Sequence, residues 1–308
     1  MPYDALLIVS FGGPEKPDDV TPFLENVTRG RNIPRERLLE VARHYHHFDG
    51  RSPINDQVRA MKARLEEHLD LPVYWGNRNW HPLLADTVRD MREAGVGRAL
   101  ALVTSAYSGY SSCRQYLENI GEARRAVANA PVIDKIPPFG LEEGFLDAVV
   151  ERVREVEPAS EAELVFTAHS IPETMAAGCS YERDLEEAAA KVSARVGCAR
   201  WSLVYQSRSG PPQQKWLGPD IGEWLEARVA KDRSPVVVVP IGFLSDHLEV
   251  LWDLDREARQ VAVSHGIPFQ RAATVGTHPR FIAMIVEMVR RYQAEPPRPC
   301  LAGCCPAR

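Results

Sequence analysis

A histidine and a row of carboxylates are the residues of this chain that could bind a metal ion and move protons. His169 ends an apolar run at residues 164–168, where we expect the carboxyl end of a buried strand. Four carboxylates follow at the three- or four-residue spacing of one helical face. They are Asp246, Glu249, Asp253 and Glu257. Imidazole and carboxylate groups both ligate divalent metals and accept protons, so the pattern predicts metal or proton-transfer chemistry.

Both features also have a structural interpretation. A lone histidine can be a core residue that a backbone carbonyl satisfies, and a row of carboxylates is common on the solvated face of a surface helix. The row begins directly after a strand and runs beside His247 and Trp252. Because α/β folds bind ligands at the carboxyl ends of their strands, this position favours a site.

Three of the six cysteines crowd the end of the chain, at Cys300, Cys304 and Cys305. Six cysteines in 308 residues are too few for a disulfide scaffold. The crowding is therefore typical of a ligand set, with zinc binding or free tail thiols as the alternatives.

Eight apolar runs rich in β-branched residues alternate with helical stretches and predict strands. They cover residues 5–11, 71–75, 99–105, 130–136, 163–170, 201–206, 235–242 and 268–274. Uninterrupted runs such as Val-Val-Val-Val at 236–239 are typical of strands buried on both faces of a parallel sheet. The first four runs resemble the last four in sequence, so we expect an α/β protein. Its two Rossmann-like halves would each be a four-stranded parallel sheet flanked by helices, with an active cleft between them.

The domain boundaries follow from these runs. Residues 1–140 form the expected first domain and residues 141–276 the second. The final helix, 277–292, is expected to cross back onto the first domain and to be followed there by the proline-stiffened tail 293–308. Another helix is predicted after Ser52, with this serine as N-cap and Pro53 at the first helical position.

Composition narrows the function. The chain has 37 basic and 42 acidic residues, without the basic excess of a nucleic-acid binder. Its longest apolar run, 236–244, is about half of a bilayer span, and no signal peptide pattern begins the chain. The motif Gly12-Gly13-Pro14 lacks the spaced glycines of a dinucleotide loop. We expect a soluble, cytoplasmic protein that acts on a small molecule or another protein.

Several motifs resemble the ferrochelatases, enzymes that insert ferrous iron into a porphyrin. They are His169-Ser-Ile-Pro, Gln206-Ser-Arg-Ser-Gly-Pro with Trp216-Leu-Gly-Pro, and Pro240-Ile-Gly-Phe-Leu-Ser-Asp-His-Leu-Glu. The resemblance runs along the whole chain in order. The opening Leu7-Ile-Val-Ser-Phe-Gly-Gly-Pro-Glu and the segment Phe23-Leu-Glu-Asn-Val-Thr-Arg-Gly-Arg are similar to an actinobacterial branch whose substrate is usually coproporphyrin III. The resemblance to ferrochelatases implies a chelatase-like fold with the porphyrin between two Rossmann-like domains.

The resemblance also assigns roles to residues. It implies that His169 is the base and a metal ligand, that Glu249 completes the site across the macrocycle, and that Asp253 and Glu257 serve metal entry or proton exit. Further residues would bind the substrate, with Ser52 and Tyr116 at its propionates and Arg29 near the ring. Phe11 and Trp216 would also contact the substrate, although some relatives have a metal-facing tyrosine in place of Phe11. Without the resemblance, Ser52 is equally well a simple cap and Arg29 a solubilising charge.

Some ferrochelatases carry a [2Fe-2S] cluster built from C-terminal cysteines and one internal cysteine. The resemblance implies the same here, with Cys300, Cys304, Cys305 and Cys113 as ligands and Cys179 or Cys198 as alternatives to Cys113. The predicted activity is the insertion of ferrous iron into coproporphyrin III to give coproheme in heme biosynthesis. Protoporphyrin IX is the alternative substrate, and a non-catalytic porphyrin or heme carrier is the alternative class. Other enzymes of the heme pathway or acceptor proteins are the expected partners.

Overall fold

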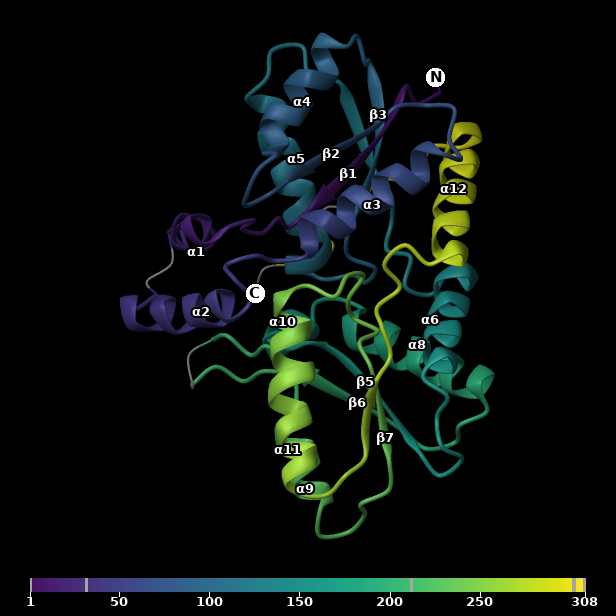
Figure 1. Ribbon diagram of the computed structural model, residues 1–308. Coiled ribbons are helices and arrows are strands. Elements are labelled where there is room, and N and C mark those ends of the chain that lie inside the picture. Colours follow the sequence, from purple (N-terminus) through teal and green to yellow (C-terminus); the bar gives the residue numbers. More distant parts are fainter. Residues whose placement is uncertain (1, 31–32, 211–212, 301–302, 307–308) are drawn as a thin grey trace. The chain divides into compact units, whose positions relative to one another are not determined.

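The computed structural model describes residues 2–30, 33–210, 213–300 and 303–306 (Figure 1). These residues form two compact units, and the chain passes between them several times. Unit 1 comprises the described residues of 1–104, 116–136 and 285–299, and unit 2 those of 105–115, 137–284 and 300–308. The expected boundaries placed 105–115 and the end of the tail in the first domain, whereas both stretches group with unit 2.

Unit 1 is built on a four-stranded parallel sheet in the order β2-β1-β3-β4. Its strands are β1 (Ala5–Ser10), β2 (Val73–Asn77), β3 (Arg98–Val103) and β4 (Val132–Lys135). Every residue of the central strand β1 is buried, as expected for a strand covered on both faces. Helices α4 (Leu84–Glu93) and α5 (Gln115–Arg125) pack their apolar side chains on one face, and α3 (Ile54–Glu66) contacts β1 and β2.

The described part of unit 1 has three further helical elements besides the end of the last helix. They are the turn η1 (Pro17–Asp19), α1 (Val20–Val27) and α2 (Arg35–His47). Residues of α12 (Pro279–Ala294) up to 284 group with unit 2 and the rest with unit 1. Near the end of α12, the side-chain amide of Gln293 accepts a hydrogen bond from the backbone nitrogen of Tyr3 at 2.7 Å. The same amide donates a hydrogen bond to the backbone carbonyl of Tyr3 at 2.9 Å.

Unit 2 repeats the architecture with the strand order β6-β5-β7-β8, again parallel. The strands are β5 (Glu163–His169), β6 (Trp201–Gln206), β7 (Val236–Val239) and β8 (Phe269–Arg271). One face carries α9 (Ile221–Arg228), η3 (Leu251–Ala258) and α11 (Arg259–Ser264), and α6 (Glu143–Glu155) and α8 (Tyr181–Val196) pack on the other (Figure 1). Shorter elements are η2 (Tyr110–Arg114), α7 (Glu173–Ala176) and α10 (Leu248–Val250). The predicted fold class is confirmed.

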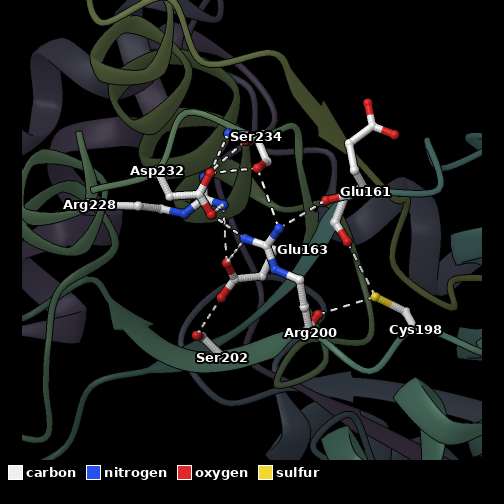
Figure 2. Close-up of polar contacts among 9 residues, drawn as sticks. Glu161, Glu163, Cys198, Arg200, Ser202, Arg228, Asp232 and Ser234 are labelled. Carbon is white, nitrogen blue, oxygen red and sulfur yellow. Dashed lines mark hydrogen bonds and ion pairs between the residues drawn. The ribbon is translucent and has the colours of Figure 1, made fainter. Parts of the chain in front are cut away.

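An ion-pair network fixes the amino end of β5 (Figure 2). The side chains of Arg228 and Glu163 are only 7% and 12% exposed, and their Nη2 and Oε2 atoms lie 3.1 Å apart. The same Arg228 nitrogen lies 2.9 Å from Asp232, and Arg200 bonds both carboxylates. Because both buried charges have hydrogen-bonded partners, the network can stabilise this end of the strand while His169 occupies the opposite end.

Two local features differ from the predictions. Helix α3 begins at Ile54 with Pro53 in the cap position, and Ser52 does not cap it; the Ser52 nitrogen instead donates to the Pro14 carbonyl at 2.9 Å. Residues 251–258 form a π-helix rather than a regular α-helix. Such π-turns are rare and occur often at functional sites.

Among the described residues, no helix has the length and apolar character that a membrane crossing needs.

Candidate active site

His169 is the last residue of β5, and its two ring nitrogens have different neighbours. The Nδ1 atom lies 2.6 Å from the Ser170 carbonyl, which can only accept a hydrogen bond, so Nδ1 carries a proton, and in the neutral imidazole Nε2 has the free lone pair. Nε2 lies 3.9 Å from a carboxylate oxygen of Glu249. With its side chain 35% exposed, His169 presents to solvent the nitrogen that can accept a proton or bind a metal.

Glu249 lies on α10, which follows β7 after the loop 240–247. Its side chain is 51% exposed, so a ligand can reach the carboxylate. His247 precedes it, and the His247 ring packs edge-on against Phe243. Burial lowers the pKa of His247, the neighbouring Glu249 raises it, and the proximity of His169 lowers it further. The imidazoles of His247 and His169 and the carboxylate of Glu249 are therefore close enough for their charges to interact.

Asp253 continues the acidic row on η3, one turn beyond Glu249. Burial raises the pKa of Asp253 to about 7, and the negative charges of Glu249 and Glu257 also raise it. Hydrogen bonds from Ser207 and Gln206 act in the opposite direction; the Gln206 nitrogen lies 3.2 Å from Oδ2. A carboxyl group with this pKa exchanges protons near neutral pH, which is what a proton relay requires.

The two ends of the predicted row have different environments. Glu257 is exposed and accepts a hydrogen bond from the Trp252 indole at 2.8 Å. Asp246 does not belong to the row, because the helix begins only at Leu248 and the Asp246 carboxylate binds Arg271 at 2.6 Å and Thr274 at 3.1 Å. The expectation of four carboxylates on one helical face was therefore wrong for Asp246, which anchors the strand-end loop instead.

Unit 1 contains a separate cluster of groups that suit an acidic aromatic ligand. The Arg78 guanidinium lies 4.4 Å from the ring centroid of Tyr116 and 5.7 Å from that of Phe11. Its Nε donates to the Asn119 side chain at 2.6 Å, which fixes the orientation of the guanidinium. Arg78 was not among the predicted site residues. Its position one residue after the end of β2 was the available signal, because ligands gather at the carboxyl ends of parallel strands.

The other predicted substrate contacts have different environments. Ser52 is buried against Gly13, whereas Arg29 is exposed just after α1. Trp216 pairs with Pro172 in a short antiparallel bridge, and the adjoining Leu217 carbonyl accepts a hydrogen bond from Ser170 Oγ at 2.7 Å. Trp216 is thus connected to the segment that follows His169. Its buried indole nitrogen has no hydrogen-bond partner among the described residues.

Several thiols approach one another in unit 2. Cys304 and Cys305 have their sulfurs 3.5 Å apart, and Cys113 and Cys305 are buried. Burial raises the pKa of Cys305 and of Cys179, and both Cys304 and Cys113 raise each of these values further. Cys300 is exposed. Across the described residues, no three His, Cys, Asp or Glu side chains stand in an arrangement that would hold a metal ion.

Cys198 lies elsewhere, at the amino end of the unit 2 sheet (Figure 2). Its sulfur contacts the carbonyls of Ala162 and Arg200 at 3.3 and 3.2 Å. The other thiols are at the end of the tail, at η2 and before α8. The structure therefore separates Cys198 from them.

Comparison with known proteins identifies the family of this chain. A model of the family described as Ferrochelatase matches residues 3–293. The chain belongs to the ferrochelatase family. A protein named ferrochelatase from Rhodopirellula baltica is 50% identical over 94% of this chain and 86% of its own length. Proteins named coproporphyrin III ferrochelatase from Nocardia farcinica and Streptomyces coelicolor are 48% and 47% identical over 99% and 100% of this chain, and these alignments cover 97% and 94% of the relatives.

Solved structures support the same fold for this ferrochelatase-family chain. SirB from Bacillus subtilis with Fe3+ has a TM-score of 0.62 at 14% identity and covers 94% of this chain and 95% of its own. CbiX, described as the terminal enzyme for siroheme biosynthesis in denitrifying bacteria, has a TM-score of 0.53 at 17% identity over 93% and 98%. At this level of identity the likeness concerns the fold alone. Family membership makes the chain a metal-insertion enzyme.

Proposed function

We propose that this enzyme inserts ferrous iron into coproporphyrin III and releases coproheme in heme biosynthesis. The observation that carries the proposal is the pair formed by His169 and Glu249, in which the imidazole Nε2 at the end of β5 lies 3.9 Å from a carboxylate on α10, the helix that follows β7. Several relatives that match nearly the whole chain are named for coproporphyrin III. A porphyrin carrier would have no need for a base opposite a carboxylate.

Metallation removes two pyrrole protons and exchanges the water ligands of iron for ring nitrogens. His169 Nε2 is the base, because its lone pair is free and Nδ1–H is tied to Ser170. Glu249 supplies the opposing carboxylate, which stabilises the imidazolium once the proton has arrived and can hold the incoming cation. Asp253, with a pKa of about 7, then takes or returns protons, and the exposed Glu257 connects this row to solvent.

Substrate recognition rests on groups of unit 1. Arg78 and Tyr116 supply a fixed cation and a hydroxyl, and Ser52 supplies another hydroxyl; these groups suit carboxylates on a flat ring. We also assign Phe11, Trp216 and Arg29 to substrate binding. Since coproporphyrin III has four propionates and protoporphyrin IX has two, a site with several such donors favours the former.

We further propose that Cys113, Cys300, Cys304 and Cys305 hold a [2Fe-2S] cluster. The chemistry of the donors fits, because an iron–sulfur cluster takes four cysteine thiolates and the nearby Cys304 and Cys113 both raise the pKa of Cys305. Cys179 is the alternative to Cys113 as the internal ligand, because the nearby Cys304 raises its pKa as well. The cluster would tie the tail to the body of unit 2, and no step of metal insertion is assigned to it.

An anaerobic assay with ferrous iron and each porphyrin tests the proposal. We expect a higher specificity constant for coproporphyrin III than for protoporphyrin IX. Equal or reversed constants would assign the enzyme to the protoporphyrin route, and tight porphyrin binding without turnover would make it a carrier. A cytoplasmic location, and an association with neighbouring heme-pathway enzymes or acceptor proteins, stay predictions that fractionation and pull-down from the native cell can test.

A further inference from the structure

The backbone of His169 is held by a tyrosine that belongs to a different element. The hydroxyl of Tyr181, the first residue of α8, donates a hydrogen bond to the His169 carbonyl at 3.0 Å. Tyr181 is buried, and its ring packs edge-on against Tyr107 with 6.4 Å between centroids. A buried hydroxyl that donates to a strand-end carbonyl restricts the residue that bears the carbonyl. His169 thus has its backbone fixed by Tyr181 and its ring fixed by Ser170.

The turn that leads into Tyr181 is in contact with the C-terminal tail. A Cβ built on Gly178 would lie 2.7 Å from Cγ of Pro306, so the proline ring rests directly on this glycine. The Gly109 backbone nitrogen hydrogen-bonds the Cys305 sulfur. Gly109 also lies beside Tyr181, because its Cβ would be 3.9 Å from the tyrosine ring. The tail therefore touches two segments that flank Tyr181.

A polar link strengthens this junction. Ser180, which occupies the N-cap position of α8, has its hydroxyl 2.6 Å from that of Ser108 and 2.5 Å from the Asp184 carboxylate. Residues 178–181 are therefore held on one side by the segment 108–109 and on the other by Pro306, and they pass directly into the tyrosine that bonds His169. A displacement of the tail would be transmitted along a short, packed stretch of chain.

We propose that Tyr181 is a positioning residue for His169, and that docking of the tail residues 303–306 onto Gly178 favours the active orientation of the histidine through it. The inference rests on the proposed role of His169 as the base. Tail docking then regulates iron insertion without any tail residue touching the substrate. The proposal concerns kcat rather than porphyrin affinity, because the histidine acts on ring protons whereas the porphyrin contacts assigned above lie mainly in unit 1.

The first test replaces Tyr181 by Phe, which keeps the ring and removes the hydroxyl. We expect kcat to fall about fivefold to tenfold, the range expected for one hydrogen bond, with an unchanged KM for the porphyrin and a melting temperature lowered by only a few degrees. Tyr107→Phe is the matched control, because the Tyr107 hydroxyl is buried without a hydrogen-bond partner among the described residues. It should keep full kcat. Wild-type kcat in Tyr181→Phe would overturn the positioning role.

The second test is a double-mutant cycle with Gly178→Ala, whose Cβ displaces Pro306. We expect Gly178→Ala to lower kcat in the wild-type background and to have a much smaller effect when Tyr181 is already Phe. Equal effects in both backgrounds would overturn the coupling to the tail. His169→Ala separates this inference from the proposed function: turnover in that variant would reject the base itself, whereas an inactive His169→Ala with normal Tyr181→Phe would reject only the positioning role.

Discussion

Nε2 of His169 lies 3.9 Å from Oε2 of Glu249, too far for a hydrogen bond and close to twice a metal–ligand bond. Divalent transition metals bind imidazole nitrogen and carboxylate oxygen at about 2.1 Å, so one cation between the two atoms can contact both. The same gap accommodates a proton carried by the imidazole and stabilised by the carboxylate. The pair can therefore serve a metal ion and a proton in turn.

Substitution of this pair should separate chemistry from binding. We expect His169→Ala and Glu249→Gln each to lower the rate of iron insertion by about 10²-fold or more, with the dissociation constant for the porphyrin changed by about twofold at most. Stopped assays under anaerobic conditions and porphyrin fluorescence titration measure the two quantities. His265→Ala in the same unit is the control. Near-normal insertion by either variant would contradict the assignment.

The buried carboxyl of Asp253 should make stability depend on pH. Because its pKa in the folded protein is raised to about 7, the folded state binds more protons than the unfolded state between about pH 4 and 7, and stability falls as the pH rises through that window. Asp253→Asn lacks this loss, so at pH 8.5 it should be more stable than the wild type by about 2 kcal/mol. Near pH 5 the two should be similar.

Urea unfolding at the two pH values checks this expectation. The exposed neighbour Glu257, changed to Gln, is the control and should change stability little at either pH. A constant difference between wild type and Asp253→Asn across the pH range would show that the Asp253 carboxyl titrates alike in the folded and unfolded protein.

The network at the amino end of β5 predicts an uneven response to the loss of arginines. Arg228→Met leaves the largely buried Glu163 carboxylate with a longer ion pair to Arg200 and a hydrogen bond from the Ser202 hydroxyl, so we expect a destabilisation of about 3 kcal/mol. Arg208→Met removes an exposed pair with Glu223 and should cost less than about 1 kcal/mol. Chemical denaturation of both variants measures the difference. Comparable losses would mean that burial at Arg228 has no energetic consequence.

Arg78 should contribute to porphyrin binding. Arg78→Met keeps much of the packing against Tyr116 and Phe11 but removes the charge, and we expect KM for coproporphyrin III to rise about tenfold, as for loss of a charge-assisted hydrogen bond, while kcat changes little. Arg89→Met, on the exposed side of α4, is the control. An unaltered KM would remove Arg78 from the substrate site.

Cysteine variants should identify the cluster ligands. We expect purified wild type to show the visible absorption and, after reduction, the electron paramagnetic resonance signal of one [2Fe-2S] cluster. Cys113→Ser should lose both, and Cys198→Ser should keep both, because Cys198 lies at the far end of its sheet. Retention of the cluster in Cys179→Ser would confirm Cys113 as the internal ligand, whereas loss in Cys179→Ser with retention in Cys113→Ser would exchange the two residues. Protein with zinc and no iron would refute the cluster.

The strands were predictable because each is a run of apolar, β-branched residues, and all eight predicted segments overlap an observed strand. His169 and Glu249 were chosen because one ends a predicted strand and the other belongs to an acidic row that follows a predicted strand, and their roles stay predictions. Asp246 was misassigned because regular spacing does not show where a helix begins, and its partner Arg271 comes from another strand. Arg78 was overlooked for a similar reason: its association with Phe11 and Tyr116 joins residues distant in sequence, which no local pattern records.

The division of α12 between the two units affects the order in which the chain can fold during synthesis. Residues 285–299 of unit 1 leave the ribosome only after the whole of 137–284. Gln293, which binds both backbone groups of Tyr3, therefore arrives about ten to thirty seconds after the earlier parts of its own unit, at the usual rate of synthesis. All four strands of the unit 1 sheet are made by residue 135, so throughout that interval the unit lacks only the end of α12 and the residues after it. The unit made first is therefore the one completed last.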